Sequence, residues 1–227
     1  MNASLLIPVA MIVAAVGGGV AIAQPQQPIR GVLDAPSTET FHRCLEPCLC
    51  PIGPVTSQLR GVFTLVPTTP EPWFDVYEVR DAVFLAQING QDMRFTGSGI
   101  YRIGGDFAYQ HEMILDLSAN GEPAQQFYGN EIIIHPPYFP RIDITIETPI
   151  VECRQTVLYL LTSPHCAADF DGDGDRGTDL DIEAFFGCLG GACCETCLTA
   201  DIDGDGDTGT DLDIEAFFRA LGGGGGC

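Results

Sequence analysis

Residues 141–147 read Arg-Ile-Asp-Ile-Thr-Ile-Glu, an unbroken alternation of polar and apolar side chains. Successive side chains of a strand point to opposite faces, so this alternation predicts a strand with one buried and one solvated face. The same pattern places six residues in a second one-sided row: Phe107, Tyr109, His111, Met113, Leu115 and Leu117. Further apolar runs predict strands at 59–65, 73–79, 131–135 and 156–161.

Short turn signals separate these runs. They are Asn89-Gly90, Gly104-Gly105 and Asn120-Gly121, and dipeptides of this kind connect neighbouring strands of antiparallel sheets. We therefore predict that residues 41–162 form an antiparallel β domain, a sandwich or a small barrel of about seven to nine strands.

The composition fits a globular, acidic protein. The 227 residues are 45% hydrophobic, enough for one medium domain and one small one, and 31 Asp and Glu stand against 10 basic residues, all of them Arg. Such a surface repels phosphate backbones and anionic membranes, which argues against nucleic acid as a partner and in favour of cations.

The N-terminus resembles a targeting segment. Residues 5–23 carry no charge and end in Ala21-Ile22-Ala23, which predicts a secretory signal peptide at 1–23. A membrane anchor is the competing interpretation, because the stretch is almost long enough to span a bilayer. After cleavage no span is expected, so the mature chain is predicted to be secreted or held at the cell surface. Residues 24–40 are rich in Pro, Gln, Ser and Thr and predict a flexible leader.

Ten cysteines fall into two even groups, which predicts a disulfide framework in an exported chain. The first group is Cys44, Cys48, Cys50 and Cys153, and a bridge from the three early cysteines to Cys153 would tie the first and last strands together. A zinc cluster that includes His42 is the alternative, although the spacing fits no common zinc pattern.

The second group lies in the last quarter of the chain: Cys166, Cys188, Cys193, Cys194, Cys197 and Cys227. Six cysteines allow fifteen pairings. A bridge between Cys166 and Cys227 would clasp the ends of this region, and the adjacent Cys193 and Cys194 are expected to have different partners. Alternatively, Cys227 stays free as an attachment thiol at the end of a glycine run.

A tandem repeat occupies the same region. The segment Asp169–Phe186 recurs 32 residues later as Asp201–Phe218 with sixteen of eighteen residues identical. After each Asp-rich loop the apolar residues fall at helical spacing, at Ile182, Phe185, Phe186 and Leu189 and again at Ile214, Phe217, Phe218 and Leu221. Neither helix can bury its two phenylalanines alone, so the two loop-helix units are expected to pack together about a pseudo-twofold axis.

Each loop has the residue pattern of a calcium site. Calcium takes six to eight oxygen ligands, and a calcium loop supplies carboxylates at positions 1, 3 and 5, a glycine at 6 and a backbone carbonyl at 7. The predicted ligands, for two ions, are Asp169, Asp171, Asp173 and the Asp175 carbonyl in the first loop, and Asp201, Asp203, Asp205 and the Asp207 carbonyl in the second.

The last ligand departs from the usual twelve-residue loop, because position 12 is Leu180 or Leu212. The nearest carboxylates are Asp179 and Asp181, then Asp211 and Asp213. We favour Asp181 and Asp213, which stand where a helix starts and where an Asp is also a good N-cap.

The duplicated loop-helix unit resembles a type I dockerin, and the cysteine-rich linker with its Gly-Cys end resembles the GC-type variant. This resemblance covers residues 169–227, within a dockerin-like domain expected at 165–227. It implies a calcium-folded module that docks on a cohesin-like receptor or a cell-surface scaffold.

The β domain shows no Gly-x-Ser-x-Gly, His-Glu-x-x-His, Walker or dinucleotide motif. No catalytic residue is therefore nominated. Three hypotheses stand: a non-catalytic β domain displayed by the tail, an enzyme acting on polysaccharide through strand carboxylates, and a carbohydrate-binding module that uses aromatic side chains.

Overall fold

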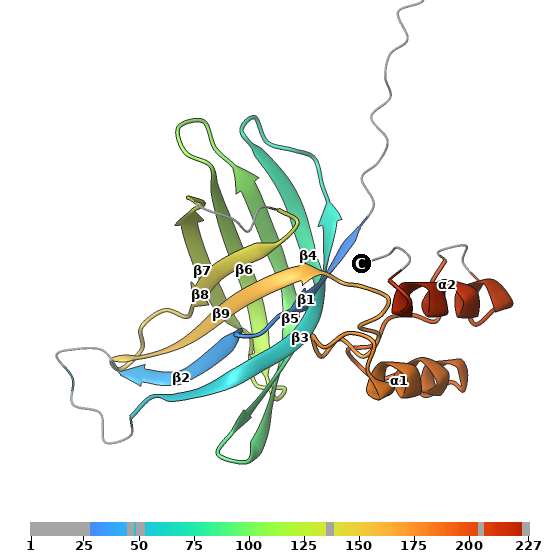
Figure 1. Ribbon diagram of the computed structural model, residues 1–227. Helices are drawn as coiled ribbons and strands as arrows, with labels where there is room; N and C mark the ends of the chain where they lie inside the picture. Colours follow the sequence, from blue (N-terminus) through green and yellow to red (C-terminus); the bar gives the residue numbers. More distant parts are fainter. Residues whose placement is uncertain (1–27, 45–47, 49–52, 135–138, 204–206, 224–227) are drawn as a thin grey trace, which may run out of the picture.

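A computed structural model describes residues 28–44, 48, 53–134, 139–203 and 207–223. Nine strands precede two helices in the described chain (Figure 1). The strands are β1 (Ile29–Leu33), β2 (Thr38–Cys44), β3 (Val55–Pro67), β4 (Phe74–Ile88), β5 (Gln91–Gly104), β6 (Gln110–Ala119), β7 (Gln125–Ile132), β8 (Ile142–Glu147) and β9 (Arg154–Pro164), and the helices are α1 (Asp179–Leu189) and α2 (Asp211–Leu221).

The strands close into an antiparallel barrel with eight strand positions. From β3 to β9 the chain runs through consecutive hairpins, and β3 pairs with β4 to complete the ring. The predicted turns at Asn89-Gly90, Gly104-Gly105 and Asn120-Gly121 lie between consecutive strands, as expected. Of the two architectures predicted for this domain, the structure is the barrel.

One position of the barrel is shared by two strands. Both β1 and β2 pair with β3 on one side and with β9 on the other. The break between them is held by Ser37, whose hydroxyl donates to the Leu161 carbonyl and accepts from the Leu161 N–H. The flexible leader predicted for residues 24–40 is therefore wrong from Ile29 onward, because this segment completes the barrel.

The barrel core follows the period-two pattern. Ile142, Ile144 and Ile146 of β8 are at most 1% exposed, which confirms the strand predicted at 141–147. The second row is confirmed from His111 to Leu117, and buried His111 faces the Tyr101 hydroxyl at 3.3 Å from Nδ1. The row is wrong at Phe107 and Tyr109, which precede β6 and are exposed.

A disulfide joins Cys48 to Cys153, as expected for a bridge between the early cysteines and the end of the barrel. It spans 105 residues, and closing a loop of that length stabilises a fold by about 4–5 kcal/mol in the chain-entropy model. Because Cys48 is bonded in this way, it is not available as a zinc ligand.

The two C-terminal helices pack against each other. The rings of Phe185 and Phe217 stack with centroids 4.1 Å apart, and Phe170 meets both edge-on. A Cβ added at Gly177 would touch Leu221, and one added at the equivalent Gly209 would touch Leu189. This exchange of equivalent contacts is the mark of a twofold arrangement, and it confirms the expected packing of the two units.

Two details of the helices differ from the prediction. Each helix begins at an aspartate, Asp179 or Asp211, three residues before the first apolar residue of the stripe. The second phenylalanine of each pair, Phe186 or Phe218, is 48% exposed, and the module core is formed by Phe170, Phe185 and Phe217 instead.

No described helix has the length and apolar character needed to cross a membrane, and the predicted signal peptide lies outside the described residues.

The cysteines of this region pair locally. Cys193 bonds Cys188 and Cys194 bonds Cys197, so the adjacent cysteines have different partners, as expected. Cys166 is also disulfide-bonded. Cys227, the partner considered for it, lies outside the described residues.

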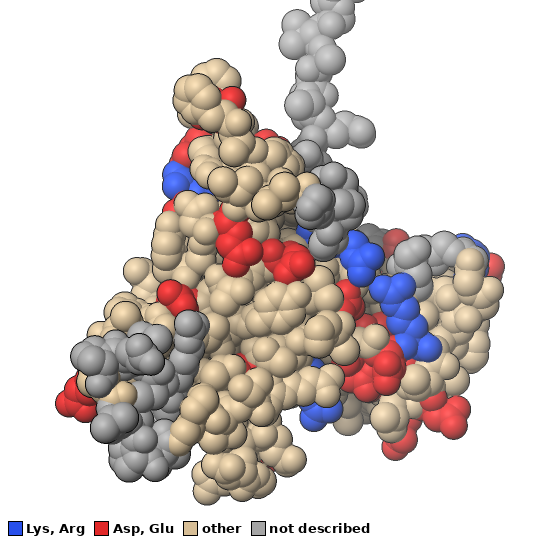
Figure 2. Space-filling model, turned by 60° about the vertical axis from the view of Figure 1, so that its left-hand side comes forward, with Lys and Arg blue, Asp and Glu red and all other residues tan. Residues whose placement is uncertain are grey.

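The helical module lies beside β1 and β3 of the barrel (Figure 1). The guanidinium Nη2 of Arg30 in β1 donates to the carbonyls of Thr196 and Cys197 at 3.0 and 2.8 Å, and Arg94 in β5 forms an ion pair with Glu195. Figure 2 shows basic and acidic side chains gathered where the two parts of the molecule meet. The barrel and the module therefore share an interface that includes segment 190–200, the cysteine-rich linker.

Candidate metal centres

Two Asp-rich loops, Asp169–Asp181 and Asp201–Asp213, are closed in the same way. The N–H of Gly177 donates to the Ala168 carbonyl at 2.6 Å, and the equivalent Gly209 N–H donates to Ala200 at 3.2 Å. In each case the ninth residue of the loop donates a hydrogen bond to the residue that precedes the loop. In the first loop this closure folds the first eight residues into a compact turn that brings the carboxylates of Asp169, Asp171 and Asp173 together.

In the first loop the side chains of Asp169, Asp171 and Asp173 each offer an oxygen, and these oxygens lie within 4.8 Å of one another. Two ligands on opposite sides of a calcium ion, at bond lengths near 2.4 Å, would be about 4.8 Å apart. The spacing of the three carboxylates therefore suits one cation among them. Asp169 is buried, and the other two are partly exposed.

In the second loop the grouped carboxylates are Asp201, Asp203 and Asp213, again within 4.8 Å. Asp205 lies outside the described residues. The group brings together the first and third loop positions and the aspartate of the following helix. It therefore places Asp213 with the early carboxylates, as the favoured last-ligand assignment requires.

Asp181 and Asp213 are fully buried at the starts of the helices. One oxygen of Asp181 accepts from the Thr178 N–H at 2.7 Å, and the other accepts from the Asp171 N–H at 3.4 Å. Asp213 likewise accepts from Thr210 at 2.7 Å and from Ile202 at 2.7 Å. Each aspartate therefore ties its helix to the opening of its own loop.

The capping role differs from the prediction. Thr178 and Thr210 are the N-caps, and Asp181 and Asp213 are the N3 residues of capping boxes. The Thr-x-x-Asp spacing in the sequence is the signal for this box. Asp179 and Asp211 are exposed, as are Leu180 and Leu212. Asp181 and Asp213 are buried and accept hydrogen bonds from their loops, but Asp181, unlike Asp213, does not belong to the carboxylate group of its loop.

The carboxylates of the first loop repel one another. Burial and, to a smaller extent, the charges of Asp181, Asp173 and Asp171 raise the pKa of Asp169 to about 7. Burial and the Asp173 charge raise the pKa of Asp171 to about 6. In the second helix burial is outweighed by hydrogen bonds from Thr210, Asp203 and Ile202, which lower the pKa of Asp213. A divalent cation would relieve the repulsion in the first loop, since it favours the ionised carboxylates.

The remaining predicted ligands are at the seventh positions. The side chains of Asp175 and Asp207 are exposed, and the Asp175 N–H donates to Asp173 at 2.8 Å. Their side chains do not belong to the carboxylate groups that the described residues form. This is compatible with the prediction that they contribute carbonyl oxygens.

The donor set of both loops consists of oxygen alone, which hard cations such as calcium prefer and zinc does not. Comparison with known proteins adds no constraint: no family model, curated protein sequence or solved structure matches the chain. The case for the two centres therefore rests on their own geometry.

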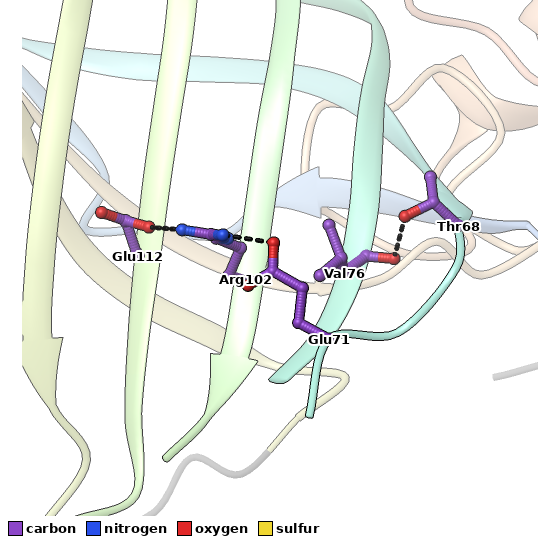
Figure 3. A network of polar contacts seen from close by, with 5 residues as sticks. All are labelled: Thr68, Glu71, Val76, Arg102 and Glu112. Atoms are coloured by element: carbon purple, nitrogen blue, oxygen red, sulfur yellow. Dashed lines mark hydrogen bonds and ion pairs between the residues drawn. The ribbon is translucent and has the colours of Figure 1, made fainter. Parts of the chain in front are cut away.

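The barrel carboxylates form no comparable group among the described residues. On the outer face, Arg102 of β5 binds Glu112 of β6 at 3.0 Å and also Glu71 (Figure 3). Of the aromatic side chains considered for sugar binding, Tyr77, Tyr101 and Phe127 are buried in the core. The exposed ones are Trp73, Phe107, Tyr109 and Tyr128.

Proposed function

We propose that the chain is a secreted or cell-surface protein whose tail is folded by two calcium ions and docks the non-catalytic barrel on a receptor. The observation that carries the proposal is a group of three carboxylates in each loop, Asp169, Asp171 and Asp173 in the first and Asp201, Asp203 and Asp213 in the second. Asp169, Asp171, Asp173 and Asp181 would hold one ion, and Asp201, Asp203, Asp205 and Asp213 the other.

The placement of the sites favours a structural role over a sensor role. Each loop is followed by one helix, and the module core is made by the helix stripes themselves, with Phe185 stacked on Phe217. Bringing the carboxylates of one loop together without a cation would be opposed by their mutual repulsion. Calcium would thus stabilise the same arrangement that buries the phenylalanines.

The docking role is supported by an exposed apolar surface on the two helices. Phe186 and Phe218 occupy equivalent positions, have ring centroids 6.4 Å apart and are each 48% exposed. Leu180 and Leu212, also equivalent, are each 58% exposed. Exposed apolar side chains repeated in this way suit a protein partner, and the dockerin resemblance suggests a cohesin-like receptor.

Calorimetry of the mature chain tests the calcium proposal. Titration with calcium should fit two sites per chain, and the unfolding transition of the tail should move to lower temperature when a chelator replaces calcium. The barrel transition serves as the internal control, since its core contains none of the loop residues. Identical profiles with calcium and with chelator would refute the proposal.

The docking role has its own test. The double variant Phe186→Ser and Phe218→Ser should keep both calcium sites and lose capture by a cohesin-like receptor. Glu183→Ser and Glu215→Ser, at exposed positions of the same helices, are the matched control. If the wild-type chain and both double variants were captured equally, the two phenylalanines would not be part of the docking surface.

A second function, polysaccharide binding, is favoured by one observation. Trp73 is 64% exposed, Phe107 is 97% exposed and Tyr109 is 49% exposed, and all three lie at one end of the barrel. The Gly105 N–H donates to the Trp73 carbonyl at 2.8 Å, so the two connections that carry these rings are in contact. Exposed aromatic faces of this kind stack on sugar rings.

Affinity electrophoresis in gels that contain soluble glycans separates this function from the first. Retardation of the wild-type chain, lost in Trp73→Ala and kept in the buried-ring variant Tyr77→Phe, would support a carbohydrate-binding module. Turnover of the glycan, lost when a strand carboxylate is neutralised, would instead support an enzyme. If no glycan of a broad panel causes retardation or is turned over, the docking role remains as the proposed function.

A further inference from the structure

The barrel is filled at one end and hollow at the other. In the filled half Phe139 packs on Tyr77 and Tyr101 with centroids 5.0 and 6.0 Å away, and His111 lies against Tyr101. Toward the opposite rim, formed by the β6–β7 and β8–β9 connections, a cavity of about 600 Å³ opens. This volume lies within the range of small-molecule sites, which are often found in barrel mouths.

The wall of the cavity is mainly apolar. Much of its inner surface consists of apolar, inward-facing residues of three neighbouring strands, namely Met93, Phe95, Leu117 and Phe127, and the buried Thr148 and Gln155 also line it. Polar side chains, among them Glu122, Gln125 and Arg154, lie around the opening. An apolar interior with a polar rim suits an apolar molecule that enters from solvent.

A buried carboxyl lies one layer below the cavity. Glu39 and Phe41 are two residues apart on β2 and share its inward face, and Phe41 lines the cavity. Glu39 is fully buried beside Leu158 and Ser57, whose hydroxyl donates to Oε2 at 3.3 Å. The other oxygen, Oε1, has no hydrogen-bond partner. Buried polar atoms are nearly always satisfied, so this oxygen calls for a partner that enters the barrel.

We propose that the cavity binds a small, mainly apolar molecule that carries a hydrogen-bond donor, such as a hydroxyl or an amine, directed toward Glu39. The apolar body would lie against Phe95, Leu117 and Phe127. Burial raises the pKa of Glu39 to about 7, so its carboxyl exchanges a proton near neutral pH and can pair with either kind of group. No lining residue belongs to the Asp-rich loops, so the inference is independent of the calcium proposal.

Fluorescence titration of the full mature chain with 1-aminoanthracene tests the site. The dye should bind at one saturable site per chain, in calcium and in chelator alike. Ala119→Trp places an indole in the cavity and should weaken binding at least about tenfold, with a smaller loss for Ala119→Leu. Ser98→Trp adds the same side chain to the outer face of β5 and should leave binding unchanged.

The absence of saturable binding by the wild-type chain would overturn the proposal. Equal binding by the wild-type, Ala119→Leu and Ala119→Trp proteins would do the same. Thermal unfolding of each variant identifies any loss that comes from misfolding, and Ala119→Leu keeps the test valid if the tryptophan is not accommodated.

The role of Glu39 is tested with a matched pair of dyes. Anthracene has the same apolar body as 1-aminoanthracene and lacks the donor. Glu39→Leu should weaken binding of the amine by about two- to tenfold and leave anthracene binding unchanged, whereas Glu39→Gln should retain most of the amine affinity. If Glu39→Leu weakened the binding of both dyes equally, Glu39 would have only a packing role, and the donor part of the proposal would be overturned.

Discussion

The first Asp-rich loop is packed between the barrel and the cysteine-rich linker, whereas the second, nearly identical in sequence, has no such cover among the described residues. At Gly172 of the first loop an added Cβ would lie 2.9 Å from Val62 of β3, and the Thr196 hydroxyl of the linker donates to the Asp171 carbonyl. In the second loop Asp203 and Asp207 are exposed. Two loops of nearly identical sequence therefore have different surroundings.

This difference separates what the loop sequence does from what its surroundings do. Both loops group three carboxylates and both bury the N3 aspartate of the following helix, Asp181 or Asp213, so these features occur in both surroundings. Burial of Asp169 and its raised pKa occur in the first loop, where neighbouring parts of the chain exclude water. We expect the first loop to hold its shape better without metal and the second to depend on the ion.

The largest effect is expected from removing the buried aspartates. Asp181→Asn should weaken the first calcium site, and Asp213→Asn the second, each by about 10–100-fold, because the amide keeps one oxygen toward the ion but removes the negative charge of a fully buried carboxylate. Hydrogen exchange in calcium should rise in the affected loop. The rise should be larger in the second loop, where Asp203 and Asp207 are exposed.

Asp179→Asn and Asp211→Asn are the controls for charge, since these neighbours are exposed. They should change calcium affinity by less than about threefold, as expected for surface charges. If the control variants matched Asp181→Asn and Asp213→Asn, the assignment of the last ligand would be wrong. Equal exchange in the two loops would remove the proposed role of the surroundings.

A smaller effect is expected at the interface that covers the first loop. Arg30→Met removes two charge-assisted hydrogen bonds from Arg30 to the linker carbonyls and should lower the unfolding free energy by about 1.5–3 kcal/mol. It should also raise the rate of amide hydrogen exchange in the first loop toward that of the second loop. Arg94→Met removes a solvent-exposed ion pair with Glu195 and should cost less than about 1 kcal/mol.

Denaturant unfolding measures both arginine variants, and hydrogen exchange locates the effect. A loss for Arg94→Met as large as that for Arg30→Met would mean that overall charge, and not the buried contact, holds the module to the barrel. Unchanged exchange of the first loop in Arg30→Met would show that the interface does not protect it.

The same interface explains why β1 could not be predicted from the sequence. Strands with one solvated face, such as β8, alternate and were predicted. In β1 the consecutive residues Gly31, Val32 and Leu33 are all buried. Leu33 belongs to the barrel core, while Val32 pairs with Val62, which the first loop covers from outside. A strand covered on both faces does not alternate, and the loop beside it comes from far along the chain: a Cβ added at Gly174 would lie 3.2 Å from the Leu33 carbonyl.

The candidate centres were more accessible to sequence analysis because their ligands are local. Positions 1, 3 and 5 lie within one turn of chain, and the duplication makes the pattern unambiguous. The choice between Asp179 and Asp181 required the helix start, which the capping threonines set. The roles of Thr196 and Arg30 could not be predicted, since their partners lie 25 and 166 residues away.

The smallest expected difference lies at two equivalent glycines of the loops. Gly177 and Gly209 have φ of 69° and 73°, so alanine at either position should cost about 1–2 kcal/mol through backbone strain. An added Cβ would lie 3.7 Å from Leu221 Cδ2 at Gly177, but 2.8 Å from Leu189 Cδ2 at Gly209. Gly209→Ala should therefore be the more destabilising by a few tenths of a kcal/mol, because a flexible leucine end must move. Thermal unfolding in calcium measures the difference, and a much larger loss for Gly177→Ala would show that the cover of the first loop adds strain there.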